Sequence, residues 1–301
     1  MKSFYSNGKL LLTGEYAVLD GALALAIPTK HGQSLKVIEN NTSQLIWKSY
    51  DEKGTLWLEA TYSLPTLSKL NSSDTDLSNK LLQILKEAQV LNPDFLTDLK
   101  GCTVETNLDF PRNWGLGTSS TLINNIAQWA NVNAFDLLKN SFGGSGYDIA
   151  CAQNDYPILY QIKEGIPSVQ RTSFKKEFEN NLYFVHLNKK QNSGNEIARY
   201  SNQKIDKKEL VKKVSKITNQ LIKCDSLQQF EILLNQHESI LATALNNQTI
   251  KEILFDDFNG SIKSLGAWGG DFILAIGDQN TPVYFKKKGF TTVIPFNKMI
   301  L

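Results

Sequence analysis

A stretch of glycine and hydroxyl side chains at residues 111–121 contains the residue types that bind phosphate. A β-rich run at 102–110 leads into it, and an apolar run with helical spacing follows it. Gly115 and Gly117 permit a tight turn that an anion can approach closely. Ser119 would then lie in the first helical turn, where unpaired N–H groups and the helix dipole attract phosphate. The alternative for this stretch alone is a glycine turn before a plain Ser/Thr helix cap.

Charged residues suited to phosphoryl transfer lie beside two other glycine turns. Lys9 and Glu15 fall within residues 6–21, where the alternative is two solvated charges on edge strands. Asp148 ends the segment 145–148, where the alternative is an ordinary turn or helix-capping residue. Phosphoryl transfer requires a carboxylate near the nucleophile and cations near the γ-phosphate. The chain has both kinds of residue in glycine-containing segments.

Residues 111–121 resemble the second motif of the GHMP kinases, the superfamily of galactokinase, homoserine kinase, mevalonate kinase and phosphomevalonate kinase. The family form is Pro-x-x-x-Gly-Leu-Gly-Ser-Ser-Ala, from which this chain departs at Thr118 and Ser120. Residues 6–21 resemble the first motif, which has Ala-Pro where this chain has Ser-Asn. Two motifs in the family's order are more specific than either motif alone.

Two further stretches extend the resemblance over nearly the whole chain. Residues 145–148 are similar to the Ser-Gly-x-Asp of mevalonate and phosphomevalonate kinases, where the Asp acts toward the substrate hydroxyl. Residues 263–272 resemble the third motif, Gly-Ala-Gly-Gly-Gly, with Trp268 in place of a glycine. Because tryptophan does not adopt positive φ cheaply, we expect its ring to flank the phosphate loop and not to lie in a core.

The resemblance implies a role for each matching residue. Asp148 and Lys9 are the implied catalytic residues, close to each other, with the carboxylate toward the acceptor and the ammonium toward the transferred phosphate. The phosphates of ATP are expected over Gly115, Leu116, Gly117, Thr118, Ser119 and Ser120. Substrate contacts are expected from Glu15, Tyr16, Ser145, Gly146, Gly269 and Gly270.

A magnesium ion is expected with the nucleotide, held by Ser119 and Asp136. Mevalonate kinases place a Glu on the helix before the catalytic Asp as a magnesium ligand. This chain has no Glu between Ser119 and Asp148, and Asp136 is the only carboxylate there. Asp136 is therefore either the replacement ligand or a solvated helix residue.

Alternating and helical patterns predict the elements that must position these residues. Strands are expected at 4–5, 9–12, 22–27, 34–38, 45–50, 55–61, 102–110, 157–161, 168–171, 181–187, 272–276, 283–285 and 291–294. Helices are expected at 77–90, 134–138, 205–224, 227–245 and 250–258, and after the glycines at 117 and 146.

The chain has 301 residues, more than one hydrophobic core usually holds, so we expect two domains. We predict an N-terminal ATP-binding domain at 1–170 and a C-terminal domain at 171–301. The resemblance implies an α+β, two-domain GHMP kinase fold. Its N-terminal domain would contain a left-handed βαβ unit, and its C-terminal domain would be ferredoxin-like. ATP and substrate would meet in the cleft between the domains.

Composition argues against several classes of protein. Hydrophobic residues make up 41% and charged residues 21%, as in soluble globular proteins. A net charge of +2 gives no reason to expect a nucleic-acid or membrane partner. No apolar run approaches a membrane span, no signal peptide is expected, and the three cysteines lack metal or redox spacing. We expect a cytoplasmic monomer or homodimer that acts on a small-molecule substrate.

Motif variants favour a mevalonate-pathway kinase, which would transfer the γ-phosphate of ATP to mevalonate or 5-phosphomevalonate in isoprenoid precursor synthesis. Residues 15–19, 146–148 and 269–271 look more like phosphomevalonate kinase than galactokinase or homoserine kinase. One alternative is a diphosphomevalonate decarboxylase-like enzyme, which shares the fold and uses ATP. The other is a non-catalytic GHMP-fold ligand-binding protein, with Trp268 as a mark of a decayed nucleotide site. The sequence leaves the acceptor open.

Overall fold

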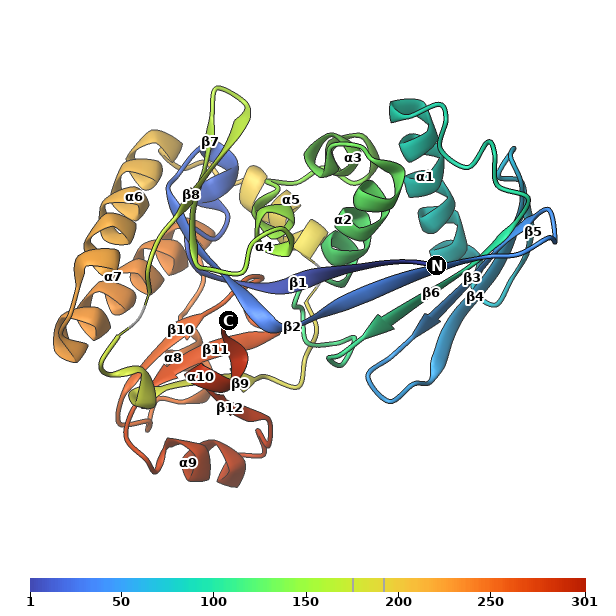
Figure 1. The fold of residues 1–301 in the computed structure, drawn as a ribbon. Helices are drawn as coiled ribbons and strands as arrows, with labels where there is room; N and C mark the ends of the chain where they lie inside the picture. The colour runs from blue at the N-terminus through green and yellow to red at the C-terminus, as the bar shows by residue number, and fades with distance from the viewer. Residues whose placement is uncertain (175, 192) are drawn as a thin grey trace. The chain divides into compact units, whose positions relative to one another are not determined.

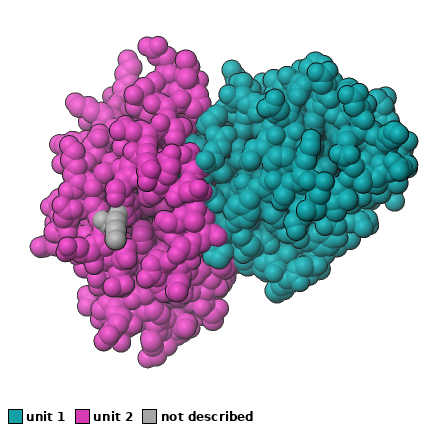
Figure 2. Space-filling view, in the orientation of Figure 1, with its two compact units in different colours: residues 1–8, 31–112, 116–153 teal, residues 9–30, 113–115, 154–301 magenta. Residues whose placement is uncertain are grey.

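The computed structural model describes residues 1–174, 176–191 and 193–301, and it divides into two compact units (Figure 2). Unit 1 contains residues 1–8, 31–112 and 116–153, and unit 2 contains residues 9–30, 113–115 and 154–301. Strands β1 (Lys2–Thr13) and β2 (Ala24–Glu39) contribute residues to both. Each unit has a hydrophobic core of its own. The domain boundary at residue 170 stays a prediction.

Unit 1 is a sheet with helices packed on it (Figure 1). Its strands follow the order β5 (Lys69–Ser72), β4 (Leu56–Ser63), β3 (Gln44–Tyr50), β6 (Cys102–Leu108) and β2. Strands β3 and β6 are parallel, with Leu45 opposite Cys102, and the other neighbours are antiparallel. The helices are α1 (Thr75–Leu91), α2 (Thr118–Ala130), α3 (Ala134–Ser141) and α4 (Tyr147–Ala152).

The alternation of buried and partly exposed side chains explains this arrangement. Every second residue of β3 is buried, including Trp47, which belongs to one core with Leu85 of α1 and Ile123 of α2. Asp74 caps α1 by accepting a hydrogen bond from the N–H of Leu77 at 3.0 Å. The core thus fixes α2, whose first turn carries the hydroxyl residues of the predicted phosphate loop.

Unit 2 contains an antiparallel sheet in the order β10 (Ser261–Ser264), β11 (Phe272–Ile276), β9 (Leu182–His186) and β12 (Val293–Pro295). Helices α5 (Ser193–Ser201), α6 (Lys207–Lys223), α7 (Leu227–Leu245) and α8 (Ile250–Leu254) connect β9 to β10, and α9 (Thr281–Lys287) connects β11 to β12. This βαββαβ order, with the first strand between the third and fourth, is ferredoxin-like. The predicted arrangement is confirmed.

The rest of unit 2 comes from three parts of the chain. The start of β2 pairs with β7 (Ile158–Lys163), and β7 pairs with β8 (Ile166–Arg171). Short helices lie at η1 (Ala17–Asp20), η2 (Glu179–Asn181) and α10 (Phe296–Met299). Over the described residues, no helix has both the length and the apolar character needed to cross a membrane.

Most expected elements are confirmed, but the strand predicted at 283–285 is wrong. These residues lie inside α9, where Pro282 occupies the first turn of the helix, a position at which its missing N–H costs no hydrogen bond. A short apolar run does not by itself distinguish strand from helix. Strands β5 and β10 and helix α5 were not anticipated, because each lies in a segment without a clear apolar period.

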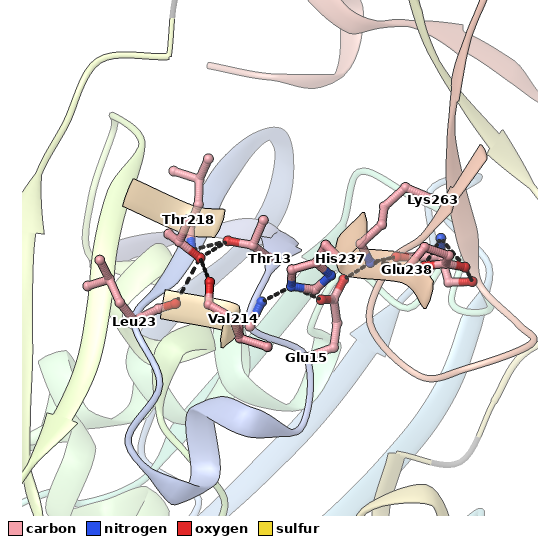
Figure 3. A network of polar contacts seen from close by, with 11 residues as sticks. Thr13, Glu15, Leu23, Val214, Thr218, His237, Glu238 and Lys263 are labelled. Carbon is pink, nitrogen blue, oxygen red and sulfur yellow. Dashed lines mark hydrogen bonds and ion pairs between the residues drawn. The ribbon is translucent and has the colours of Figure 1, made fainter. Parts of the chain in front are cut away.

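A network of buried ionisable side chains crosses the core of unit 2 (Figure 3). The Nζ atom of Lys263, on β10, lies 2.7 Å from Oε1 of Glu15 and 3.4 Å from Oε2 of Glu238 on α7. The side chains of all three are at most 3% exposed. His237, next to Glu238, accepts a hydrogen bond through Nε2 from the N–H of Gly14 at 3.0 Å. The network therefore joins the turn after β1 to α7 and β10.

The hydrogen bond from Gly14 requires a neutral imidazole. Burial, with the nearby charge of Lys263, lowers the pKa of His237 well below its ordinary value of 6.5. Burial also raises the pKa of Glu15, while the Lys263 ammonium opposes that rise. The native protein therefore binds fewer protons at His237 than the unfolded chain does in mildly acidic solution.

We predict that this histidine makes the folded protein less stable as the pH falls below about 6.5, because only the unfolded chain protonates it. One such group removes at most about 1.4 kcal/mol of unfolding free energy per pH unit. His237→Gln retains a hydrogen-bond acceptor and does not titrate, so the part of the pH-dependent stability loss that comes from His237 should be absent in this variant.

Urea unfolding of both proteins at pH 7.5 and 5.5 measures the difference. The raised pKa of Glu15 acts in the opposite direction, and Glu15 is present in both proteins, with Oε2 3.7 Å from Nε2 of His237 in the wild type. The same pH dependence in wild type and variant would contradict the prediction.

Candidate functional site

The predicted strand, glycine turn and helix occur in that order. Strand β6 ends at Leu108, and α2 begins at Thr118 after Gly117, which adopts φ 92° as the N-cap residue. The N-cap residue, being glycine, has no side chain that could cap the helix. The N–H groups of the first turn lack intrahelical acceptors, so this end of α2 can bind an anion. The predicted local structure is confirmed, while the phosphate-binding role stays a prediction.

Two hydroxyl residues of the first α2 turn have different environments. Ser119 is exposed, whereas Ser120 is only 5% exposed and donates its hydroxyl hydrogen to Oδ2 of Asp148. The other oxygen of Asp148 accepts a hydrogen bond from the N–H of Ile149 at 3.0 Å. Unit 1 therefore brings the predicted catalytic carboxylate to the predicted phosphate-binding helix end.

Asp148 is not the capping residue of its helix. The N-cap of α4 is Gly146, with φ 84°, and Asp148 is the second residue inside the helix. Its carboxylate points to Ser120 of α2, on a different helix. Asp148 is therefore not the N-cap residue of α4, and its catalytic role and its proximity to Lys9 stay predictions.

Two charged side chains converge in unit 2 at the first glycine of the predicted loop. The Lys9 ammonium donates a hydrogen bond to the carbonyl oxygen of Gly115 at 2.9 Å. The carboxyl group of Asp271 lies directly against the α-carbon of Gly115, because a Cβ built there would be 2.3 Å from Cγ of Asp271. Burial raises the pKa of Asp271, and the nearby charge of Lys9 lowers it.

The predicted substrate residues of the first motif are buried in unit 2. The Glu15 side chain is 2% exposed and pairs with Lys263. The hydroxyl oxygen of Tyr16 accepts a hydrogen bond from the N–H of Trp268 at 2.7 Å. These contacts connect the first motif to the third, and direct contact with a substrate stays a prediction for both residues.

The remaining predicted substrate residues lie in two turns. Ser145 is partly buried just before Gly146, the N-cap of α4. Gly269 and Gly270 lie between β10 and β11, and Gly270 packs so closely that a Cβ would be 2.2 Å from Cγ of Gln191. Their contact with a substrate also stays a prediction.

The expectation for Trp268 is wrong. Its ring is 6% exposed and belongs to a hydrophobic cluster of unit 2 with Tyr16, Tyr200 and Leu241. The neighbouring Gly269 has φ 81°, but Trp268 itself does not adopt positive φ. The loop therefore accommodates tryptophan at this position without positive φ, and its ring packs in the core of unit 2.

Asp136, the predicted magnesium ligand, is exposed in the first turn of α3. Its backbone N–H bonds to the capping side chain of Asn133. Among the described residues, no group of three or more His, Cys, Asp or Glu side chains is arranged to hold a metal ion. Ser119 and Asp136 remain the predicted pair of oxygen donors.

Sequence reasoning missed Asp271, Lys263 and His237 as partners of the first motif. Lys263 is 248 residues from Glu15, and a pairing at that separation has no periodic signal. Asp271 offered one clue, because it directly follows two glycines of the third motif. Glycine allows close approach of a neighbouring group, and here the close approach is between Asp271 and another glycine, Gly115.

A depression of about 570 Å³ lies elsewhere in unit 2, against Lys30, Tyr156, Arg171, Phe174 and Asn297. None of the described residues that line it is a predicted site residue. This depression therefore does not mark the candidate site.

No protein-family model matches the chain, and no curated protein matches it in sequence. Solved structures match nearly its full length. A Methanococcus jannaschii mevalonate kinase has a TM-score of 0.70 at 16% identity, covering 97% of this chain and 96% of that one. A Streptococcus pneumoniae phosphomevalonate kinase, in complex with phosphomevalonate and AMPPNP, has a TM-score of 0.68 at 17% sequence identity, and the match covers 96% of each chain.

A Lactococcus lactis galactokinase complexed with galactose also matches, with a TM-score of 0.68 at 14% identity, over 95% of this chain and 88% of that one. Kinases with different named substrates thus match about equally well. At such identities the likeness establishes the fold and not the acceptor. The chain has the mixed α+β fold of the GHMP kinases.

Proposed function

We propose that this protein is an ATP-dependent small-molecule kinase whose acceptor is mevalonate or 5-phosphomevalonate. One observation carries the proposal. The Asp148 carboxylate is bonded to Ser120 in the first turn of α2, at a helix end that no side chain caps. An anion-binding helix end and a carboxylate that can orient a nucleophile are the two parts that phosphoryl transfer needs from unit 1. The GHMP kinase fold supports this assignment.

ATP fits the N-terminus of α2. We propose that the N–H groups of Thr118, Ser119 and Ser120 bind its phosphates, because the first turn of a helix leaves such donors unpaired. Gly117 contributes no side chain that would compete with an anion. The phosphomevalonate kinase with bound AMPPNP shares the fold, which supports a nucleotide here.

The donor atoms available also fit magnesium. This cation takes oxygen ligands and is commonly held by one or two protein side chains together with substrate phosphates and water. The exposed hydroxyl of Ser119 and the exposed carboxylate of Asp136 are the proposed protein ligands. When bound, the metal would neutralise charge on the β- and γ-phosphates.

Two charged side chains would act on the reacting atoms. Asp148 would accept or orient the proton of the acceptor hydroxyl, because its carboxylate is already held by Ser120. Lys9 would offset negative charge on the transferred group. Glu15, Tyr16, Ser145, Gly146, Gly269 and Gly270 are the proposed substrate-side residues.

The two alternative functions differ from the kinase in the products that they would form. A diphosphomevalonate decarboxylase-like enzyme would release carbon dioxide together with phosphate. A non-catalytic protein would bind a ligand without turnover, with Trp268 and the altered Ser6-Asn7 as marks of a decayed nucleotide site. Lys9, Ser119 and Asp148 are all present as well.

A screen of purified protein with ATP, magnesium and single acceptors tests the function. Mevalonate, 5-phosphomevalonate, homoserine and galactose are the acceptors, and ADP formation is the signal. We expect acceptor-dependent ADP with mevalonate or 5-phosphomevalonate. ADP formation only with galactose or homoserine would support kinase activity but reject the proposed acceptors. If no acceptor increases ADP formation, the proposed kinase activity is wrong.

Asp148→Asn should reduce kcat by roughly 10²–10⁴-fold, because it retains the shape of the side chain and removes the proton acceptor. ATP binding, measured by calorimetry, should survive. Asp98→Asn, which changes an exposed carboxylate of the same unit, is the matched control. Wild-type turnover by Asp148→Asn would show that this carboxylate has no role in the chemistry.

Ser119→Ala should lower the affinity for magnesium in the presence of ATP by roughly 10–100-fold, since it deletes a proposed ligand. The magnesium dependence of turnover measures this effect. Ser119→Thr keeps the hydroxyl and should recover most of the affinity. An unchanged magnesium dependence in the alanine variant would remove Ser119 from the metal site.

Lys9→Met should lower kcat by about 10²–10³-fold and change ATP affinity little, because the charge is needed mainly where negative charge develops. Steady-state kinetics separate the two quantities. Lys2→Met, at the exposed start of the same strand, is the control. A loss confined to ATP affinity would make Lys9 a nucleotide-binding residue instead.

A further inference from the structure

The backbone at Asp271 is fixed in a conformation that few side chains tolerate. Its φ is 52°, in the left-handed region that aspartate enters at some cost. The N–H of Asp271 donates to the carbonyl oxygen of Lys189, and its own carbonyl accepts from the N–H of Leu187, both at 2.8 Å. Strand β11 begins at the next residue. The direction of the Asp271 side chain is therefore set by main-chain bonds on both sides.

That direction brings the carboxylate onto Gly115. A Cβ at Gly115 would be 2.3 Å from Cγ and 2.4 Å from Oδ2 of Asp271, so no larger residue fits without displacing the carboxylate. Gly115 also has φ 66°, which favours glycine independently. The carboxylate is thus in contact with the first glycine of the proposed phosphate loop.

Lys9 reaches the same glycine from β1. Its ammonium donates to the carbonyl oxygen of Gly115 at 2.9 Å, and its charge is the largest influence that favours the ionised form of Asp271. His186 and Lys190 have smaller effects of the same sign, and the N–H of Gln191 is 3.4 Å from Oδ1. Because Asp271 is 8% exposed, its charge depends on these partners.

We propose that Asp271 is a positioning residue that holds the Lys9 ammonium against Gly115, where the proposed phosphate loop begins. The proposal rests on the proposed function for the role of Lys9, but the positioning itself does not. Asp271 touches no reacting atom in this account. It acts by restricting a long, flexible side chain before any substrate binds.

The restriction has a kinetic consequence. A lysine side chain loses rotamer freedom when it is ordered, and this loss opposes the ordered state. A carboxylate that orders Lys9 in the free protein removes that cost from the transfer step. Its loss should therefore lower kcat and leave the binding of ATP, proposed for the N–H groups of α2, largely unchanged.

Two variants of the full chain test the proposal. Asp271→Asn removes the charge and tolerates positive φ, and Asp271→Gly removes the whole carboxylate and fits positive φ without strain. If one variant fails to fold, the other still tests the contact. Asp278→Asn, an exposed carboxylate just beyond the other end of β11, is the matched control.

The first measurement does not depend on activity. Reductive methylation of lysines, followed by mass spectrometry, reports how available the Lys9 amine is, with the exposed Lys2 as internal reference. Removing the negative charge that lies near this partly exposed lysine should accelerate labelling of Lys9 about threefold in both Asp271 variants. Labelling rates equal to those of wild type and the Asp278 control would overturn the proposal.

The second measurement is steady-state kinetics. The Asp271 variants should lose about 10–100-fold in kcat with KM for ATP within about twofold of wild type. A higher KM with unchanged kcat would overturn the positioning role. If the wild type transfers phosphate to no acceptor, the proposed function fails, and the labelling result still decides whether Asp271 holds Lys9.

Discussion

The buried ammonium of Lys263 is the constraint on which the structure of unit 2 most depends. A charge with only 1% of its side chain exposed must be paired, and Glu15 and Glu238 supply the pairing. Their positions bring the turn after β1, helix α7 and strand β10 together. Removal of Lys263 would leave two buried carboxylates without their cation, whereas replacement of all three side chains by apolar groups would leave no buried charge.

The contacts of Lys263 also position the loop that follows it. It runs from β10 to β11, is held to the first motif by the bond between Trp268 and Tyr16, and ends at Asp271. The first and third motifs are therefore one connected structure within unit 2, with Lys9 and Gly115 at its end. The tryptophan that departs from the family pattern contributes packing to this connection.

Unit 1 depends on a simpler contact, between Ser120 and Asp148. Two helix starts, α2 and α4, each follow a glycine of positive φ and have no side-chain cap. The hydroxyl of one helix meets the carboxylate of the other, so each helix limits the position of the next. The Ser120–Asp148 contact therefore lies at the first turn of α2, where the N–H groups of a helix have no intrahelical acceptors.

Local patterns in the sequence predicted local structure well. The helix after Gly117 and the turn before Asp148 follow from glycine chemistry, and the long amphipathic helices α6 and α7 follow from apolar spacing. The strand expected at 283–285 was wrong, because three apolar residues carry no period. Pairings between distant segments, such as Glu15 with Lys263, could not be predicted from sequence patterns, because they follow from tertiary packing alone.

The most direct test of the account is to follow the γ-phosphate of ATP itself. Phosphorus NMR of the wild-type reaction, with mevalonate or 5-phosphomevalonate as acceptor, distinguishes a new organic phosphate from inorganic phosphate. We expect the spectrum to show ADP and one phosphorylated acceptor in equal amounts. With diphosphomevalonate as a further substrate, formation of ADP, inorganic phosphate and carbon dioxide would identify a decarboxylase. An ATP spectrum that stays unchanged with every acceptor would contradict the kinase.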